Sequence, residues 1–249
     1  MKRPFILISV IALLLIITGG NPFSPYRATQ GVLAENFTEL ETGVQRQANG
    51  IYVVKALTRM PAVKPDMVKW WFADYMQTSE HYKMWHPTAH LWMDWENKIP
   101  GEIVGASHLV HEYIGKDLHK LRIQFVNPAD FLEEYQERDD QFVVCAKTGL
   151  LEEPLYMGSM CHVVNETDFG SVMRSTFWLG QIHKREANKE VTSIESIIGN
   201  TALARTLIAN GQLPTDLMVH AIEEMGYLSD FLPDLYKQER KNIELVADH

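Results

Sequence analysis

The sequence predicts an α+β fold in which a long C-terminal helix crosses a curved antiparallel sheet and encloses a cavity. Strand-like segments fill most of the region from residue 51 to residue 182, and short turns join neighbouring segments. Short turns imply antiparallel pairing of the strands that they connect. The helix-like segments lie before and after this run, and helices on one side of such a sheet are typical of the α+β class.

The strands are predicted from their content of β-branched and aromatic residues or from the alternation of apolar and polar positions. A four-residue turn, Thr167-Asp168-Phe169-Gly170, separates the last two of them, and Asn127-Pro128 ends an earlier one. The predicted strands cover residues 51–58, a segment starting near His90, and residues 102–114, 118–126, 141–147, 155–165 and 171–182.

Helices are predicted mainly from their start signals. Pro65 begins a short helix that reaches Met76, and residues 199–209 form a small helix ended by Asn210-Gly211. Pro214, followed by Thr215 and Asp216, predicts the start of the C-terminal helix, because proline suits the first helical turn. Pro233 is expected to kink or restart this helix. The histidine-rich and aromatic stretch that begins at Glu80 is expected to be a loop, and residues 183–190 a charged connector.

Composition indicates a folded protein that does not bind nucleic acid. The 249 residues are long enough for one large core, and we expect a single domain over residues 49–241, followed by a tail at 242–249. The formal net charge is −9, and no basic footprint for phosphate is present. Small molecules are therefore the expected partners.

The N-terminal segment predicts export. Lys2-Arg3 precede the apolar stretch Phe5–Ile17, so residues 1–20 are expected to be a signal peptide or an N-terminal membrane anchor. Residues 21–48 are predicted to be a linker or irregular arm. The positive charges before the apolar stretch place the domain outside the cytoplasm, touching the membrane only through this segment. Whether the segment is cleaved stays open.

The C-terminal helix carries two polar side chains on its apolar side. At about 100° per residue, Leu217, Ala221, Met225, Tyr227, Leu228 and Phe231 share an arc that also contains His220 and Glu224. Glu223 and Asp230 fall on the opposite side. A His and a Glu four residues apart are more often a surface contact, but a buried carboxylate needs a partner or a cation. This arc therefore favours a metal site.

Other ligand-type residues lie on the predicted strands. Alternation places His108 and Glu112 on one wall and His111 on the other face, and His162 shares a face with its apolar neighbours. His81, His86 and His90 are alternatives for a further ligand, and the first two, like His119 and His183, are expected to be partly exposed.

The two cysteines, Cys145 and Cys161, do not form a disulfide framework or a zinc-ribbon pattern. Each lies in an apolar strand-like segment, and we interpret both as small buried hydrophobic residues. A disulfide between them stays open for an oxidising compartment.

An ordered set of short motifs resembles the family of 2,4-diacetylphloroglucinol (DAPG) hydrolase, over residues 50 to 238. The motifs are Trp70-Trp71-Phe72, Tyr82-Lys83-x-Trp85-x-Pro87-x-x-His90, Gly105-Ala-Ser-His108-x-x-x-Glu112-x-Ile-Gly115, Cys161-His162, Phe177-Trp178-x-Gly180 and His220-x-x-x-Glu224.

The resemblance implies a Bet v 1-like helix-grip fold and a zinc-dependent hydrolase. Such an enzyme cleaves the carbon–carbon bond between an acyl group and an aromatic ring or diketone-like carbon. Matched motif by motif, the metal ligands would be His90, Glu112, His220 and Glu224. Imidazole and carboxylate ligands suit zinc or another divalent first-row metal. The resemblance thus selects His90 from the three candidate histidines.

The resemblance also implies roles for four residues around the metal. His162 would transfer a proton, and Tyr82 would hydrogen-bond the substrate. His108 would line the cavity or support a ligand. Phe177 stands where the family has a second substrate-binding tyrosine and has no hydroxyl, so the resemblance does not extend to the phloroglucinol substrate of the family.

The leading hypothesis is thus a metal-dependent hydrolase acting on a small aromatic or acylated compound. The alternative is a non-catalytic carrier of apolar small molecules, because a fold does not decide a function. A non-haem iron oxygenase is disfavoured, because two glutamates leave fewer open positions than a single carboxylate does.

Overall fold

The computed structural model describes residues 41–132, 135–201, 203–205 and 211–247. The predicted signal peptide or anchor at residues 1–20 lies outside these ranges. Among the helices of the described residues, none has the length and apolar character needed to span a membrane.

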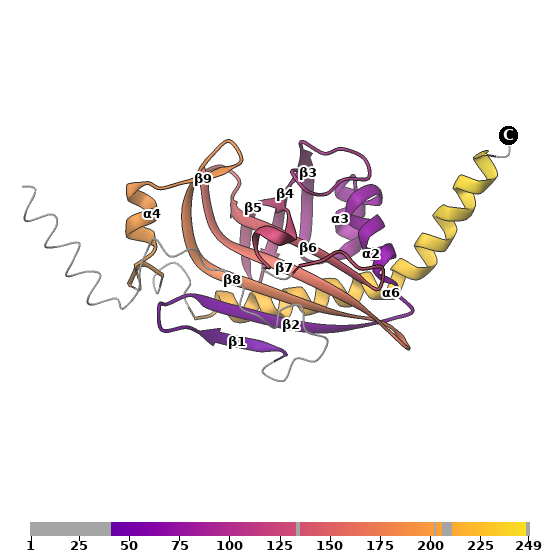
Figure 1. Ribbon diagram of the computed structural model, residues 1–249, viewed down its shortest axis with the longest axis horizontal. Coiled ribbons are helices and arrows are strands. Elements are labelled where there is room, and N and C mark those ends of the chain that lie inside the picture. Colours follow the sequence, from indigo (N-terminus) through magenta and orange to yellow (C-terminus); the bar gives the residue numbers. More distant parts are fainter. Residues whose placement is uncertain (1–40, 133–134, 202, 206–210, 248–249) are drawn as a thin grey trace, which may run out of the picture.

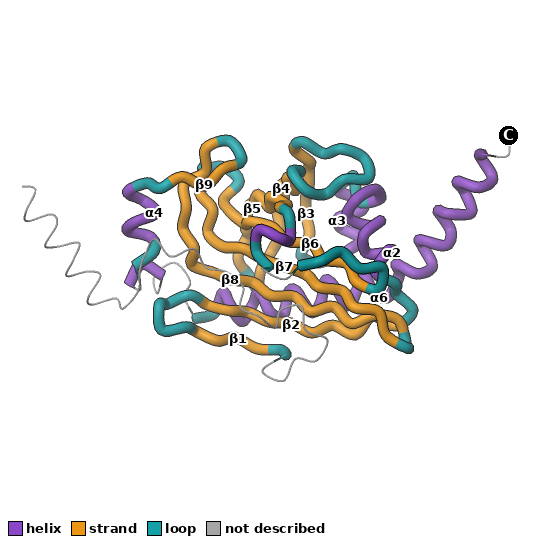
Figure 2. Tube along the Cα trace, in the orientation of Figure 1, coloured by secondary structure: helices purple, strands orange, loops and turns teal. Residues whose placement is uncertain are grey.

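One antiparallel sheet forms the body of the protein (Figures 1 and 2). The strands follow the order β1-β2-β8-β7-β6-β5-β4-β3, and β9 pairs with β8. This arrangement confirms the predicted antiparallel α+β sheet. The strands are β1 (Gly43–Arg46), β2 (Tyr52–Pro61), β3 (His90–Glu96), β4 (Ser107–Ile114), β5 (Asp117–Val126), β6 (Gln141–Leu150), β7 (Leu155–Thr167), β8 (Gly170–Glu186) and β9 (Lys189–Val191).

A long C-terminal helix, α6 (Leu213–Ala247), runs along the sheet as the helix-grip arrangement requires (Figure 1). It begins next to Pro214, as predicted. Figure 1 places α2 and α3 near one end of the sheet and α4 near the other. The remaining helical segments are α2 (Pro65–Trp70), the π-helical turn η1 (Trp71–Tyr75), α3 (Ser79–Trp85), the 3₁₀ turn η2 (Pro128–Asp130) and α4 (Ile194–Gly199).

Four segments differ from the sequence-based expectation. The stretch from Glu80, predicted as a loop, begins inside α3, whose start is capped by the Thr78 hydroxyl accepting from the His81 amide at 3.3 Å. The predicted charged connector is the hairpin of β8 and β9, because solvent-facing strand positions tolerate charge. Within the predicted irregular arm, β1 pairs with β2. The predicted tail contains the last turns of α6 up to Ala247.

The C-terminal region also differs in detail from the sequence-based prediction. The helix α4 begins at Ile194, after a capping box at Ser193, and the predicted helix over 199–209 is helical at 203–205 within the described residues. Residues 206–210 lie outside them. Pro233 lies inside α6 without restarting the helix. Tyr227, assigned above to the apolar arc, is 41% exposed.

The two faces of the sheet carry separate apolar clusters. The larger one lies between the sheet, α6 and the α2–α3 region, and includes Met160 and Phe177. The smaller one lies on the opposite face, around Cys145, Cys161 and Trp178. Alternation along each strand produces this division.

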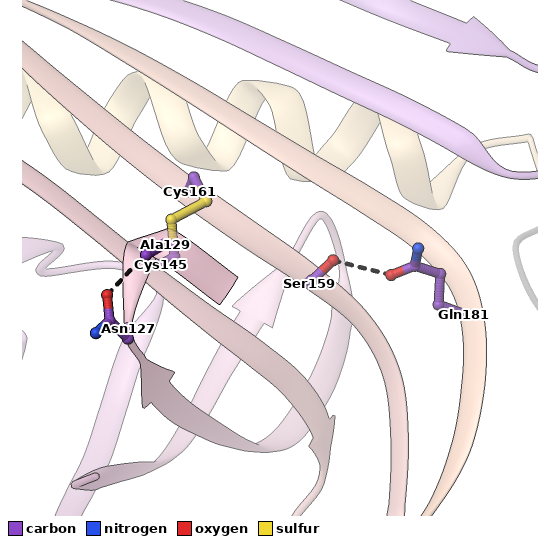
Figure 3. Close-up of a disulfide and its surroundings, with 6 residues drawn as sticks. All are labelled: Asn127, Ala129, Cys145, Ser159, Cys161 and Gln181. Carbon is purple, nitrogen blue, oxygen red and sulfur yellow. Dashed lines mark hydrogen bonds between the residues drawn. A yellow bond between two sulfur atoms is a disulfide. The ribbon is translucent and has the colours of Figure 1, made fainter. Parts of the chain in front are cut away.

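The cysteines form a disulfide across β6 and β7, where they are direct neighbours (Figure 3). The predicted burial of both side chains is confirmed, and the disulfide that the sequence left open is present. Their pairing depends on strand register, which composition and spacing do not specify.

Candidate metal centre

Four side chains from two strands and one helix converge beside the cavity that the sheet and α6 enclose. His90 lies on β3, Glu112 on β4, and His220 and Glu224 on α6. The Nε2 atom of His90 is 3.8 Å from a carboxylate oxygen of Glu112 and 3.6 Å from one of Glu224. The Nε2 atom of His220 is 3.9 Å from the same Glu224 oxygen. All four predicted ligands are thus brought together.

Local structure explains this convergence. His90 and Glu112 are opposite each other in the β3–β4 pairing, beside an irregularity between His90 and Trp92. His220 and Glu224 are one helical turn apart on the buried side of α6. The exposed fractions of these four side chains are low, between 1% for His90 and 8% for Glu224. The sequence-based argument for an inward His220 and Glu224 is confirmed.

Hydrogen bonds and ring contacts fix the His90 ring. Its Nδ1 atom is 2.9 Å from the backbone oxygen of Tyr82, and its ring stacks on Tyr82 with centroids 3.7 Å apart. Within the described part of the chain, His90 Nε2 is buried and has no hydrogen-bond partner. The remaining nitrogen therefore points to the two carboxylates, as a ligand would.

Burial shifts the pKa values of the whole cluster toward neutral forms. It raises the pKa of Glu112, and it raises the pKa of Glu224 well above its usual range, with a further contribution from the Glu112 charge. Burial also lowers the pKa of His90 to about 2 and that of His220 to about 4. Neutral imidazoles are the form that binds metals.

The donor set fits a divalent cation. His90, Glu112 and His220 each offer a ligand atom within 4.8 Å of the others, and Glu224 adds a carboxylate beside both histidines. Two buried carboxylates without a cation are costly, and an ion between them would offset that cost. The buried Nε2 of His90, to which the described residues offer no hydrogen bond, is the observation that most favours an ion here.

A cavity of about 320 Å³ adjoins the cluster, a size typical of small-molecule sites. Most of its wall is apolar, with side chains from β4 to β8 and from α6. Glu112, His220 and Glu224 form part of the wall. The predicted site residues Tyr82, His108, His162 and Phe177 all line it.

The four cavity residues differ in their hydrogen bonds and ring contacts. The Tyr82 hydroxyl donates to a Glu112 carboxylate oxygen. The His162 Nδ1 atom is 2.7 Å from the Ser175 hydroxyl. His108 stacks on Trp95 at 4.7 Å between centroids, and its buried Nε2 has no hydrogen-bond partner among the described residues. The Phe177 ring meets the His162 ring edge-on at 5.8 Å.

Sequence reasoning missed two residues near the site. His86, expected to be partly exposed, is buried at the end of α3 and stacks on His220 at 5.0 Å. Its Nε2 atom is 3.4 Å from the exposed Glu223 carboxylate. Ser175 could have been found by counting outward from the turn at Thr167–Gly170, which pairs it with His162.

Comparison with known proteins gives one family and two kinds of relative. The family model for the DAPG hydrolase PhiG domain matches residues 26–237. A 2,4-diacetylphloroglucinol hydrolase of Pseudomonas protegens is 24% identical over 220 residues, which are 83% of this chain and 71% of that protein. The phloretin hydrolase of Eubacterium ramulus is 26% identical over 208 residues, 78% of this chain and 70% of that protein.

Solved structures are similar at lower sequence identity. The crystal structure of Ara h 8.0201 is 9% identical with a TM-score of 0.43, over 73% of this chain and 97% of that one. The di-domain ARO/CYC StfQ from the steffimycin biosynthetic pathway is 13% identical with a TM-score of 0.45, over 76% of this chain and 53% of that one.

Proposed function

This chain belongs to the DAPG hydrolase PhiG domain family, and from that premise we propose that it is a metal-dependent hydrolase of carbon–carbon bonds. The bond cleaved would join an acyl group to an aromatic ring or a diketone-like carbon. Two relatives are named 2,4-diacetylphloroglucinol hydrolase and phloretin hydrolase, which supports an enzyme. The observation that carries the proposal is the cluster of His90, Glu112, His220 and Glu224 beside a mostly apolar cavity.

The metal in this proposal is zinc or another divalent first-row ion. His90, Glu112, His220 and Glu224 would hold it, with imidazole and carboxylate ligands of the kind that such ions prefer. When bound, a metal of this type polarises a carbonyl oxygen and lowers the pKa of water. The Tyr82 hydroxyl, which donates to Glu112, would orient that carboxylate toward the ion.

His162 is the proposed proton carrier. Burial lowers its pKa to about 4, so the ring is neutral near pH 7 and can accept a proton. Its Nδ1 atom is engaged with Ser175, which leaves Nε2 for the exchange. We assign it the removal of a proton from the attacking water and the return of that proton to the ring carbon released by cleavage.

Three further side chains at or near the cavity wall would contact the substrate. Phe177 can only pack against a ligand, since it lacks a hydroxyl. His108 offers a buried Nε2 at the cavity wall and can hydrogen-bond a phenolic oxygen. Tyr82, stacked on His90, would contact the acyl group next to the metal.

Metal content and turnover test the proposal together. Protein purified without added metal should contain about one divalent ion per chain. It should also release a carboxylic acid from acylphenols, detected by mass spectrometry. His220→Ala should lose both properties. His111→Ala is the matched control, because His111 lies on β4 next to Glu112 but faces away from the cavity.

Two results would overturn this assignment. Retention of the ion by His220→Ala would refute the ligand set. Tight binding of apolar compounds by metal-free protein, without turnover of any acylphenol, would instead support the carrier function considered above.

Export from the cytoplasm is part of the same proposal. The buried disulfide between Cys145 and Cys161 supports an oxidising compartment, and the apolar stretch Phe5–Ile17 after Lys2-Arg3 supports a route to it. Cell fractionation with thiol labelling tests this. Oxidised cysteines in an extracytoplasmic fraction are expected, and a reduced cytoplasmic protein would contradict the proposal.

A further inference from the structure

The cavity has two chemically different ends, with the candidate metal centre between them. At one end the wall is aromatic and includes Phe72, Trp85, Phe125 and the His108 ring. At the other end the wall is mainly aliphatic, with Leu150, Met157, Leu179, Leu213 and Leu217, although His119 and Thr148 also line it.

Strand direction places the aliphatic residues at one end. In an antiparallel sheet, the last residues of one strand lie beside the first residues of the next. Leu150 ends β6, Met157 is near the start of β7, and Ile114 ends β4, so all three lie at the same end. His108 lies at the start of β4, about 13 Å before Glu112.

Helix α6 contributes side chains to the wall between the candidate metal centre and the aliphatic end. Leu217 and Leu213 lie about one and two turns before His220 on α6, so the second is roughly 10 Å from it along the axis. Both line the cavity, as do His220 and Glu224. A chain attached to a carbonyl at the metal centre would therefore meet Leu217 first and Leu213 next.

Burial distinguishes the two ends as well. Phe72, Trp85 and Phe125 are buried by the protein itself, whereas Leu150, Met157, Leu179, Leu213 and Leu217 are only half-buried. Among the described residues of the cavity wall there is no lysine or arginine. The aliphatic end thus presents apolar surface that an uncharged apolar group would cover, and a carboxylate would find no cationic partner there.

From this division we infer that the acyl group of the substrate is an aliphatic chain longer than acetyl. This inference rests on the proposed function. The phenolic ring lies at the aromatic end, with a hydroxyl near His108, and the carbonyl lies at the metal centre. The chain extends along α6 and covers the aliphatic end. The substrate class is a neutral acylphenol with a medium-length alkyl chain.

Two homologous series test the inference. The first contains 2-acylphloroglucinols from acetyl to decanoyl, and the readout is kcat/KM. The second contains 4-alkylresorcinols, which lack the acyl carbonyl, and the readout is Kd by calorimetry on the metal-loaded full chain. Each methylene buried at the aliphatic end should improve kcat/KM and Kd by about fourfold, until the chain reaches solvent.

Variants locate the effect. Leu150→Ser should flatten the dependence on chain length, and Met157→Ser is a second variant at the same end. Leu118→Ser is the control, because Leu118 lies on β5 but is exposed and outside the cavity wall; it should keep the wild-type dependence.

The outcomes separate this inference from the function on which it rests. Alkylresorcinol affinity that rises with chain length supports the aliphatic end even if no acylphenol is cleaved. Turnover and affinity that do not change with chain length overturn the inference while leaving the hydrolase intact. An unchanged chain-length dependence in both Leu150→Ser and Met157→Ser would also overturn it.

Discussion

The two faces of strands β6 and β7 have different roles. On the inner face, Met160 and His162 border a hollow that adjoins the candidate metal centre. On the outer face, Cys145 and Cys161 are covalently joined inside a packed apolar cluster with Trp178. Alternate residues of one strand thus supply chemistry on one side and stability on the other.

This contrast has an energetic meaning. The inner face borders buried ionisable groups whose charged forms are disfavoured, such as His162 on β7 and Glu224 on the facing helix α6. Such groups cost stability unless a ligand or an ion compensates them. The outer face contains apolar side chains and a cross-link, which both favour the folded state. Changes on the inner face should therefore alter activity far more than stability, and changes on the outer face should do the reverse.

The largest effect is expected from His162→Asn on the inner face. The amide can keep the hydrogen bond with Ser175 but cannot carry the proton, so kcat should fall by about 10²–10⁴-fold. The melting temperature and the metal content should stay close to those of the wild type. A kcat within a few-fold of wild type would remove His162 from the reaction.

A smaller effect, of opposite character, is expected on the outer face. The double variant Cys145→Ala/Cys161→Ala opens a cross-link between residues 16 apart, which should lower the free energy of unfolding by about 3 kcal/mol. Denaturant titration measures this change. The folded variant should keep its kcat, and a loss of kcat without a loss of stability would contradict the division of roles.

The smallest of the three effects is a pH dependence of stability that comes from His162 on the inner face. Burial lowers the His162 pKa to about 4 from its usual 6.5, so between these values the unfolded chain binds a proton that the folded chain does not. Its contribution to stability is complete above pH 6.5 and is lost as the pH falls through this window. Between pH 7 and pH 5 the loss should be about 2 kcal/mol.

Comparison of the wild type with His162→Asn isolates the contribution of His162 to the pH dependence of stability. The variant should lose less stability than the wild type over the same pH range, because it no longer has the titrating ring. Equal losses would show that His162 is not held neutral by burial.

Sequence periodicity predicted the parts of the site that lie on regular elements. The helical arc placed His220 and Glu224 inward, and alternation placed Glu112 and His108 on the cavity wall. His90 could not be separated from His81 and His86 in this way, because it follows an irregular segment after α3. Only the family resemblance selected it.

Two of the features that were missed, the burial of His86 and the disulfide, depend on contacts between segments that are distant in the sequence. His86 is buried because α6 packs against the end of α3, and no local pattern indicates that contact. The Cys145–Cys161 bond depends on the register of β6 and β7, and the pairing of these strands contains an irregularity between Thr148 and Gly149. Thr78 was overlooked as a cap because aromatic and histidine residues obscure the period of α3.

The candidate ligands are far apart in the chain, from His90 near the first strands to Glu224 in the last helix. An unfolded polypeptide cannot gather them, so an ion bound at this position would favour the folded state alone. Chelation would then lower the thermal stability of the protein as well as its activity, and the docking of α6 would complete the binding pocket for the ion.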